Sequence, residues 1–242
     1  MELREMIYRR KSVRSYTGVP LSEDTIQKIQ AFSEGIKPLY PDIKTHMEIV
    51  ERETVKCICP WTTPQLAVFF CEDKDGALEN VGFIYQQLEL YIQSLGLGSC
   101  WLGMGRLDPK ADIKPPEGMK FAMMLAFGQP KGDAVRNDIS EFKRKKLSEI
   151  SDREDERLEP ARLAPSSVNS QPWYFTHEGD VIHAYCGLSG FFRKKSASDI
   201  NLIDMGIALA HLCVSYPDSF RFFKADAPAE INGYIYIGSF KI

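Results

Sequence analysis

The sequence from residue 164 to residue 173 is Ala164-Pro165-Ser166-Ser167-Val168-Asn169-Ser170-Gln171-Pro172-Trp173. Small hydroxyls and two amides lie between two prolines, so the stretch is too polar for a protein core. Its side chains supply both hydrogen-bond donors and acceptors, which recognition of a polyol chain or of the polar edge of a ring system requires. A turn followed by a strand is the other interpretation, because Ser, Asn and Pro are common turn formers.

A second motif, Arg10-Lys11-Ser12-Val13-Arg14, stands near the N-terminus. In an extended segment, alternation places Arg10, Ser12 and Arg14 on one side. Two guanidiniums and a hydroxyl suit a phosphate, because guanidinium binds phosphate oxygens in a bidentate manner. Taken alone, such residues equally describe a solvated basic face.

The third motif is the glycine-rich run Gly96-Leu97-Gly98-Ser99-Cys100-Trp101-Leu102-Gly103-Met104-Gly105. Its glycines allow the backbone to approach a flat ligand, and Trp101 and Leu102 offer apolar surface. A plain loop is the alternative. The run lacks the GxGxxG spacing of a dinucleotide fold, and the chain has no Walker sequence.

In combination, the three motifs resemble the nitroreductase family of FMN enzymes. In that family an Arg-x-Ser-x-Arg segment grips the flavin phosphate, and Pro-Ser-Ser-x-Asn-x-Gln-Pro-Trp forms a loop at the flavin. The resemblance therefore implies that FMN is the cofactor, with a backbone N–H at Gly103 near flavin N5. It assigns cofactor binding to Arg10, Ser12, Arg14, Trp101, Leu102, Gly103, Met104, Arg144, Pro165, Ser166, Ser167, Asn169 and Gln171. The match of Arg144 to the family's C-terminal basic pair is equally explained by a solvated charge run.

The spacing of the motifs departs from the family. Ordinary members carry the Arg-Ser-Arg and Ser-Ser-Asn-Gln motifs in one N-terminal stretch and form dimers, whereas here the motifs occupy residues 10–14 and 165–173. The resemblance then implies an α+β, nitroreductase-like fold of two half-repeats, each with a β-sheet flanked by helices, that form an intrachain pseudo-dimer. We expect halves at residues 1–132 and 160–242, joined by a charged connection at 133–159, and at most one flavin per chain.

Local patterns predict the main elements and support a repeat. Helices are expected at residues 22–32, with Ser22 as N-cap, at 80–95 and at 201–213, and strands at 66–71, 119–127 and 231–237, the last ending at Gly238. Asn80-Val81-Gly82 matches Asp204-Met205-Gly206, and residues 121–128 match 231–238. A chance likeness between two α+β segments is the alternative.

Composition limits the partners. The chain has 242 residues and a net charge of −3, which does not favour nucleic acid. The longest apolar run has seven residues, against the roughly 18 that a membrane helix needs. With no export signal visible, we expect a soluble, cytoplasmic protein with reduced cysteines. Cys57 and Cys59 are the only close cysteine pair, and no metal-ligand spacing is present.

The resemblance implies a ping-pong reaction in which NADH or NADPH reduces the flavin and a small-molecule acceptor, such as a nitroaromatic or a quinone, takes the electrons. Dehalogenation, flavin reduction and ring fragmentation are alternative outcomes. A non-catalytic flavin-binding module, such as a sensor or carrier, is the alternative from another class. No catalytic acid or base is required, so His177, His183 and His211 are expected to be structural, and Trp61 and Trp173 are expected to pack against the sheet. A monomer is expected.

Overall fold

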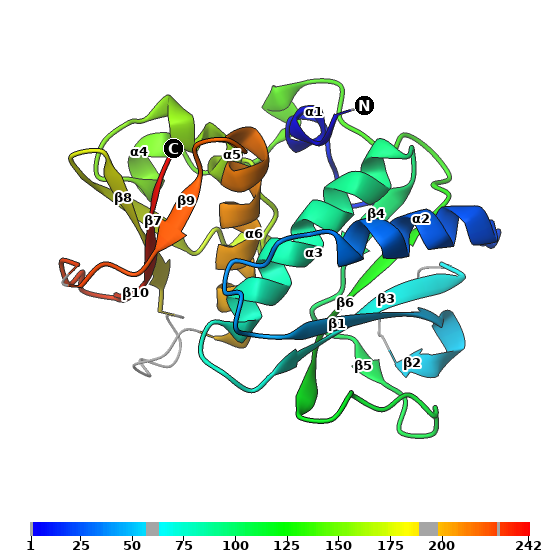
Figure 1. The fold of residues 1–242 in the computed structure, drawn as a ribbon. Coiled ribbons are helices and arrows are strands. Elements are labelled where there is room, and N and C mark those ends of the chain that lie inside the picture. The colour runs from blue at the N-terminus through cyan, green and yellow to red at the C-terminus, as the bar shows by residue number, and fades with distance from the viewer. Residues whose placement is uncertain (1, 57–62, 189–197, 227) are drawn as a thin grey trace.

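The computed structural model describes residues 2–56, 63–188, 198–226 and 228–242 (Figure 1). The helices are α1 (Leu3–Ile7), α2 (Glu23–Glu34), α3 (Ala77–Ser94), α4 (Leu147–Ile150), α5 (Glu159–Arg162) and α6 (Asp199–Ser215). The strands are β1 (Thr45–Glu51), β2 (Val55–Lys56), β3 (Gln65–Glu72), β4 (Gly98–Trp101), β5 (Arg106–Leu107), β6 (Met119–Gly128), β7 (Trp173–Glu178), β8 (Val181–Gly187), β9 (Arg221–Phe223) and β10 (Tyr234–Lys241). The fold thus mixes helices with antiparallel sheets, as expected.

Two four-stranded sheets share one topology. Their strand orders are β1-β3-β6-β4 and β7-β8-β10-β9, and all paired strands are antiparallel. Along the chain, each sheet is built from two strands, a long helix and two further strands, apart from the small β2-β5 pair. In Figure 1, α3 and α6 lie side by side between the two sheets. This matched order is the arrangement that the half-repeat hypothesis requires.

The two long helices cross where both carry glycine. A Cβ on Gly82 would lie 2.0 Å from the Ile203 carbonyl oxygen, and a Cβ on Gly206 would lie 2.0 Å from the Glu79 carbonyl oxygen. These contacts are reciprocal, since Gly206 and Ile203 follow Gly82 and Glu79 by 124 residues each. Such exchange of equivalent contacts is the property of a twofold interface. The matched triplets Asn80-Val81-Gly82 and Asp204-Met205-Gly206 therefore meet at one point.

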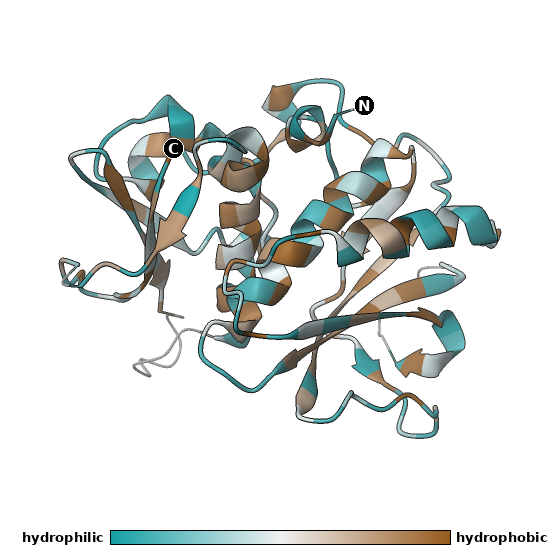
Figure 2. Ribbon diagram, in the orientation of Figure 1, coloured by the Kyte–Doolittle hydropathy of each residue, from teal (hydrophilic) through white to brown (hydrophobic). Residues whose placement is uncertain are grey.

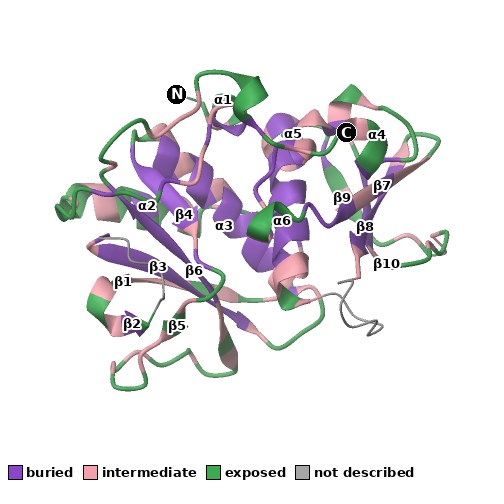
Figure 3. Ribbon diagram, turned by 180° about the vertical axis from the view of Figure 1, so that it is seen from behind, coloured by how far each residue is buried: buried purple, intermediate pink, exposed green. Residues whose placement is uncertain are grey.

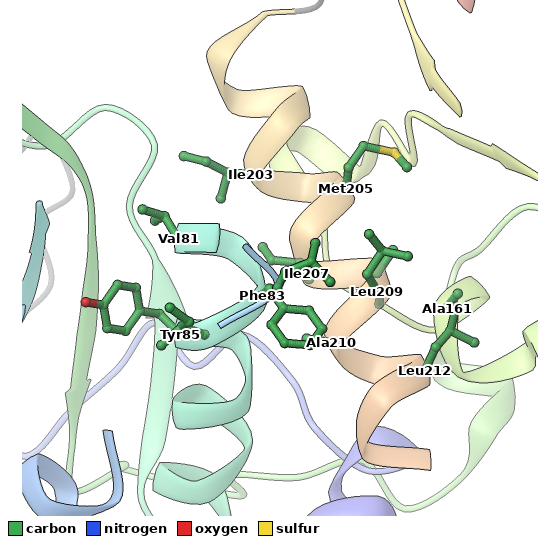
Figure 4. Close-up of a cluster of buried hydrophobic side chains, with 14 of the residues drawn as sticks. Val81, Phe83, Tyr85, Ala161, Ile203, Met205, Ile207, Leu209, Ala210 and Leu212 are labelled. Atoms are coloured by element: carbon green, nitrogen blue, oxygen red, sulfur yellow. The ribbon is translucent and has the colours of Figure 1, made fainter. Parts of the chain in front are cut away.

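Apolar side chains close the crossing on both sides. Figure 4 shows Val81 and Phe83 of α3 facing Ile203, Ile207 and Ala210 of α6. All five are at most 3% exposed. The α6 ribbon is mostly hydrophobic in Figure 2, and both long helices are largely buried in Figure 3. A helix that is apolar on all sides belongs in a core. One hydrophobic cluster extends from Phe69 in β3 to Phe240 in β10, and so joins the first unit, which holds the sheet β1-β3-β6-β4 and α3, to the second unit, which holds the sheet β7-β8-β10-β9 and α6.

Several predicted elements agree with the structure. Ser22 caps α2 by accepting a hydrogen bond from the Thr25 amide, and β3, β6 and α6 cover the predicted segments. The predicted helix at 80–95 corresponds to α3, which ends one residue earlier, at Ser94. The connection at residues 133–159 contains only short helical turns. Two of its acidic residues have basic partners, since Asp155 pairs with Arg157 at 2.6 Å and His177 contacts Asp152 at 2.6 Å.

Two predicted segments need correction. The strand expected at 231–237 begins at Tyr234 and continues through Gly238 to Lys241. The pairing with β8 shifts register between Tyr236 and Gly238, where a side chain would strike the ring of Phe222, so the glycine permits a bulge instead of ending the strand. The glycine-rich run is partly strand rather than loop, because Gly98–Trp101 forms β4 against β6.

Candidate functional site

The arginine segment, residues 10–14, lies between α3 and β4. Arg10 is 1% exposed and donates through Nε and Nη2 to the carboxylate of Glu89, with distances of 2.9 to 3.2 Å. Nη2 also donates to Ser12 Oγ at 3.2 Å. The backbone of Ser12 forms an isolated parallel β-bridge with Ser99 in β4, and Arg14 is exposed. The segment is therefore held by a buried ion pair, and Ser12 and Arg14 are the members closer to solvent.

Glu89 organises a buried polar network that sequence reasoning missed. Its carboxylate accepts from Gln86 Nε2 at 2.8 Å, Gln93 Nε2 at 2.6 Å and Ser99 Oγ at 2.9 Å. Full use of its lone pairs is what makes a buried charge tolerable. The available sequence signal was the polar series Gln86, Glu89 and Gln93 at helical spacing in an otherwise buried helix.

The same network fixes Trp101 and His211. Trp101 Nε1 donates to Gln86 Oε1 at 3.0 Å, and Gln86 Nε2 lies 3.1 Å from His211 Nε2. His211 Nδ1 lies 2.9 Å from the Pro160 carbonyl oxygen, which can only accept, so Nδ1 carries the proton and Nε2 accepts. Burial lowers the pKa of His211 to about 3. His211 is therefore a neutral structural residue that links α6 to α3.

The glycine turn, residues 102–105, follows β4. The Leu102 amide donates to the Met124 carbonyl at 2.9 Å, and its side chain is buried in the hydrophobic cluster that includes Met124. Gly103 is exposed, and no hydrogen bond from the described residues engages its N–H. Met104 is 68% exposed. The turn therefore presents the Gly103 amide and the Met104 side chain, whereas Leu102 faces the core.

The serine loop, residues 164–171, has an unusual backbone. Val168, Asn169 and Gln171 have φ angles of 47°, 58° and 49°, in the left-handed region that side chains disfavour. Strain of this kind persists only where surrounding contacts impose it, and it clusters at functional sites. Val168 is 96% exposed, so its conformation is not explained by burial of its side chain.

Hydrogen bonds within the serine loop and from neighbouring residues hold its left-handed backbone in place. Ser166 Oγ accepts from the Gln171 amide at 2.9 Å, and Gln171 Oε1 accepts from the Lys145 amide at 2.8 Å. Gln171 is 3% exposed and Pro165 is also buried. Both carboxylate oxygens of Asp204 in α6 lie 3.1 Å from the Ser167 amide nitrogen. Gln171 and Asp204 thus hold the loop from inside, and Ser166, Ser167 and Asn169 lie on its more accessible part.

Arg144 joins the loop to a group of guanidiniums. It donates to Asn169 Oδ1 at 2.6 Å and to the Ala164 carbonyl at 3.0 Å. Burial lowers its pKa to about 9, with further lowering by Arg10, Arg136 and Arg162. Arg136 and Arg144 both lie over the ring of Phe142, at 4.1 and 5.7 Å, and Arg136 Nη1 donates to the Arg10 carbonyl. Several guanidinium groups therefore lie close together between the arginine segment and the serine loop.

The structure brings together segments that are far apart in sequence. A Cβ on Gly103 would lie 3.9 Å from Ser167 Oγ and 3.8 Å from Ile200 Cδ1, so the glycine turn of the first unit faces the loop and helix of the second. The arginine segment pairs with β4 through Ser12 and Ser99, and its Arg10 carbonyl accepts from Arg136. Arg136 shares the ring of Phe142 with Arg144, which in turn bonds to Asn169 in the serine loop. Of the residues expected to bind a cofactor, Leu102 and Gln171 direct their side chains into the protein, and the Arg10 side chain is bonded to Glu89.

A cavity of about 500 Å³ lies at a different place, lined by Tyr40, Glu79 and Lys224 among others. It resembles the loop region in one contact: Tyr40 donates its amide to Asn80 Oδ1 at 2.8 Å, as Ser167 donates to Asp204. Asn80 and Asp204 are 124 residues apart, like Gly82 and Gly206. The cavity is therefore the topological counterpart of the region around the serine loop.

The family model described as "Putative TM nitroreductase" matches residues 2–216. The chain belongs to this family. A Thermotoga maritima protein described in the same terms has a similar fold, with a TM-score of 0.65 and 18% identity, over 99% of this chain and 92% of that one. A nitroreductase family protein from Clostridium difficile 630 has a TM-score of 0.50 and 15% identity, over 62% and 96%. An FMN-dependent nitroreductase from Clostridium difficile R20291 has a TM-score of 0.46 and 18% identity, over 60% and 98%. No curated protein matches the sequence.

Within the described ranges, none of the helices combines the length and the apolar character of a membrane span. No group of three His, Cys, Asp or Glu side chains in those ranges could hold a metal ion. Cys71, Cys100, Cys186 and Cys213 are free thiols, whereas Cys57, Cys59 and Trp61 lie outside the part of the chain that is described.

Proposed function

We propose that this nitroreductase family member is an FMN-dependent oxidoreductase that transfers electrons from NADH or NADPH to a nitroaromatic, quinone or similar small acceptor by a ping-pong reaction. The observation that carries the proposal is the meeting of the arginine segment, the glycine turn and the serine loop from the two topological units. When bound, FMN would supply the hydride chemistry. The chain's own residues would bind and orient the cofactor.

The phosphate would lie among the guanidiniums. Arg144 and Arg136 are partly desolvated and close to a third cation, Arg10, so an anion placed there would relieve their mutual repulsion. Ser12 Oγ and Arg14 complete the donor set that the motif implies. Arg10, whose charge Glu89 balances, would contribute mainly by positioning Ser12.

The ring system would lie between the glycine turn and the serine loop. The Gly103 N–H has no partner among the described residues and would donate near N5, beside Trp101 and Met104. Ser166, Ser167 and Asn169, with Pro165 and Gln171 behind them, would supply donors to the polar edge. Preorganised donors of this kind stabilise charge that develops on the ring during reduction.

One flavin per chain is the stoichiometry we propose. The counterpart cavity is lined by four carboxylates, Asp73, Asp75, Glu79 and Asp199, against three lysines. It lacks an arginine, and Glu79 is 6% exposed, so a phosphate entering there would meet a buried acid. The two units therefore differ in charge at equivalent places.

A comparison of FMN with riboflavin tests the phosphate site. Arg144→Ala should raise the Kd for FMN by about 10- to 100-fold, because a hydrogen bond to a charged group contributes about 1.5–3 kcal/mol. The Kd for riboflavin, which has no phosphate, should change much less. Quenching of flavin fluorescence measures both constants. Arg157→Ala, which removes a cation paired with Asp155, is the control. An equal effect on both flavins would contradict the site, and two flavins per chain would contradict the stoichiometry.

Redox cycling separates the enzyme from a non-catalytic flavin-binding module. The enzyme should lose its yellow colour with NADH or NADPH under anaerobic conditions and regain it with a nitroaromatic or quinone. A carrier or sensor should stay yellow with either nicotinamide. A panel of acceptors would then distinguish nitroreduction from dehalogenation, flavin reduction or ring fragmentation.

We further propose that the protein is a monomer, because the contacts between α3 and α6 already occupy the face that a second chain would use. We also propose a cytoplasmic location and unit boundaries at residues 1–132, 133–159 and 160–242.

A further inference from the structure

Asp204 occupies an unusual position for a carboxylate. It lies in the second turn of α6, is 3% exposed and has no cationic partner within ion-pair distance among the described residues. Its oxygens accept instead from the Ser167 amide, at 3.1 Å each, and the Ser170 side chain lies close enough to lower the pKa of the carboxyl. Burial outweighs these bonds and raises its pKa to about 7. A group of this kind is expensive to bury and needs an explanation.

Asn80, the topological equivalent of Asp204, shows that a neutral amide can serve in this position. Its Oδ1 accepts from the Tyr40 amide at 2.8 Å. Its Nδ2 donates to the carbonyl oxygens of Tyr40 at 2.8 Å and Ile43 at 3.2 Å. The loop around Tyr40 therefore presents both donors and acceptors to its helix, and asparagine matches this pattern.

The serine loop presents one amide donor to both oxygens of Asp204, since the Ser167 N–H lies 3.1 Å from each. An ionised carboxylate accepts at both oxygens and makes this a charge-assisted hydrogen bond. An asparagine would place an NH₂ group, itself a donor, where the Ser167 N–H now meets the second oxygen. The charge at Asp204 thus accounts for the inward turn of the Ser167 amide and supports the left-handed backbone at Val168 and Asn169.

We propose that Asp204 is a positioning residue whose ionised carboxylate holds the serine loop in its flavin-binding conformation, so that flavin affinity falls when Asp204 is protonated. The inference rests on the proposed flavin site. Protonation places a hydrogen on one of the two oxygens that share the Ser167 N–H and removes the charge that strengthens this hydrogen bond. Because protonation occurs as the pH falls through about 7, affinity should increase from acidic to alkaline pH.

Other groups near α6 do not produce the same behaviour. The pKa of the Cys186 thiol on β8 is raised to about 12 by burial, with contributions from Glu79 and Asp204, and His211 remains neutral. Other charged or titratable groups on the elements packed against α6 are bonded to partners other than Asp204: Arg162 to Glu159, His177 to Asp152, His183 to Ser239 and Glu89 to Arg10. The helices α1 and α3, which also pack against α6, carry Arg4, Glu5 and Glu79. All of these stay unchanged when only Asp204 is replaced.

The test is a titration of the full-length apoprotein with FMN between pH 5.5 and 8.5, followed by flavin fluorescence. The wild-type Kd should decrease about tenfold or more over this range, since loss of one charge-assisted hydrogen bond corresponds to at least that factor. Asp204→Asn should bind more weakly at pH 8.5 and lack this component. Titration of the FMN phosphate is common to both proteins and cancels in the comparison.

Two further variants keep the test decisive. Ser170→Ala removes an exposed side chain that lowers the pKa of Asp204, so the pH at which affinity changes should move upward, and this holds even if Asp204→Asn folds poorly. Asp199→Asn removes an exposed carboxylate from the same helix and should behave as wild type. Retention of the wild-type pH dependence by Asp204→Asn, an unshifted pH dependence in Ser170→Ala, or loss of the dependence in Asp199→Asn would overturn the inference. Absence of flavin binding by the wild-type protein at every pH would instead refute the proposed function.

Discussion

At the scale of single residues, the site depends on two buried carboxylates with opposite environments. Glu89 is fully buried but balanced by Arg10 and by three further donors. Asp204 is also buried but accepts only from neutral groups, and its pKa is raised accordingly. Glu89 therefore serves the fold of the arginine segment, whereas Asp204 is the carboxylate through which we propose that pH acts on the serine loop.

Removal of Glu89 should strongly destabilise the chain. Glu89→Ala leaves the guanidinium of Arg10 buried without a counterion, and breaking a buried pair in this way costs about 3–5 kcal/mol. Urea unfolding followed by circular dichroism measures the loss in free energy of unfolding. Lys28→Ala, which breaks the exposed Lys28–Asp24 pair, should change stability little. Similar losses of stability in the two variants would show that the buried Arg10–Glu89 pair does not stabilise the fold more than an exposed pair does.

At the scale of elements, close contact of two helix backbones joins the units. Glycine at the crossing removes side chains from both helices, so carbonyl groups of one helix reach the backbone of the other. Apolar side chains on either side then bury their surface together. The serine loop is bonded to α6 through Asp204, and the glycine turn follows β4, which packs against α3, so the crossing also influences their separation.

Alanine at either crossing glycine should destabilise the chain to a similar degree. Each Cβ would meet a carbonyl oxygen at 2.0 Å, and backbone cannot move aside as a flexible side chain can. Overpacking of a core typically costs about 1–3 kcal/mol, and we expect Gly82→Ala and Gly206→Ala to reach at least this range. Gly132→Ala, where nothing lies within 4 Å, is the matched control. Thermal or urea unfolding of the three variants gives the comparison, and wild-type stability in both helix variants would disprove the close crossing.

At the scale of the whole molecule, two units of the same topology share one core. The principal hydrophobic cluster includes residues from both sheets and both long helices, such as Phe69, Leu88, Phe175 and Leu212. Neither unit can bury its long helix without the other. The units are thus alike in topology but unequal in chemistry, with arginines near the serine loop and carboxylates in the counterpart cavity.

A shared core predicts one cooperative unfolding transition. Trp101 lies in the first unit and Trp173 in the second, so two double variants, each keeping one of these tryptophans as the only one, report on separate units. In each double variant, the urea midpoint measured by tryptophan fluorescence should equal the midpoint measured by circular dichroism. A midpoint for either tryptophan that differs from the circular dichroism midpoint of the same variant would show that the units unfold independently.

The sequence by itself determined the elements with strong local patterns and the composition of the motifs. Ser22 followed by spaced apolar residues specified α2, and continuous apolar runs specified β3 and β6, because capping and periodicity act within a few residues. The helices carrying Gly82 and Gly206 could be matched by their neighbouring residues alone. The motifs at 10–14 and 164–173 also named the residues that surround the candidate site.

Only the tertiary structure decided what those residues contact. Arg10 meets Glu89 across 79 positions of sequence, and Ser167 meets Asp204 across 37. The passage of β10 through Gly238 likewise depends on the ring of Phe222 from a neighbouring strand. Burial, charge balance and left-handed backbone in the loop are set by groups that come together only after the two long helices pack, and no local pattern in the chain encodes such distant contacts.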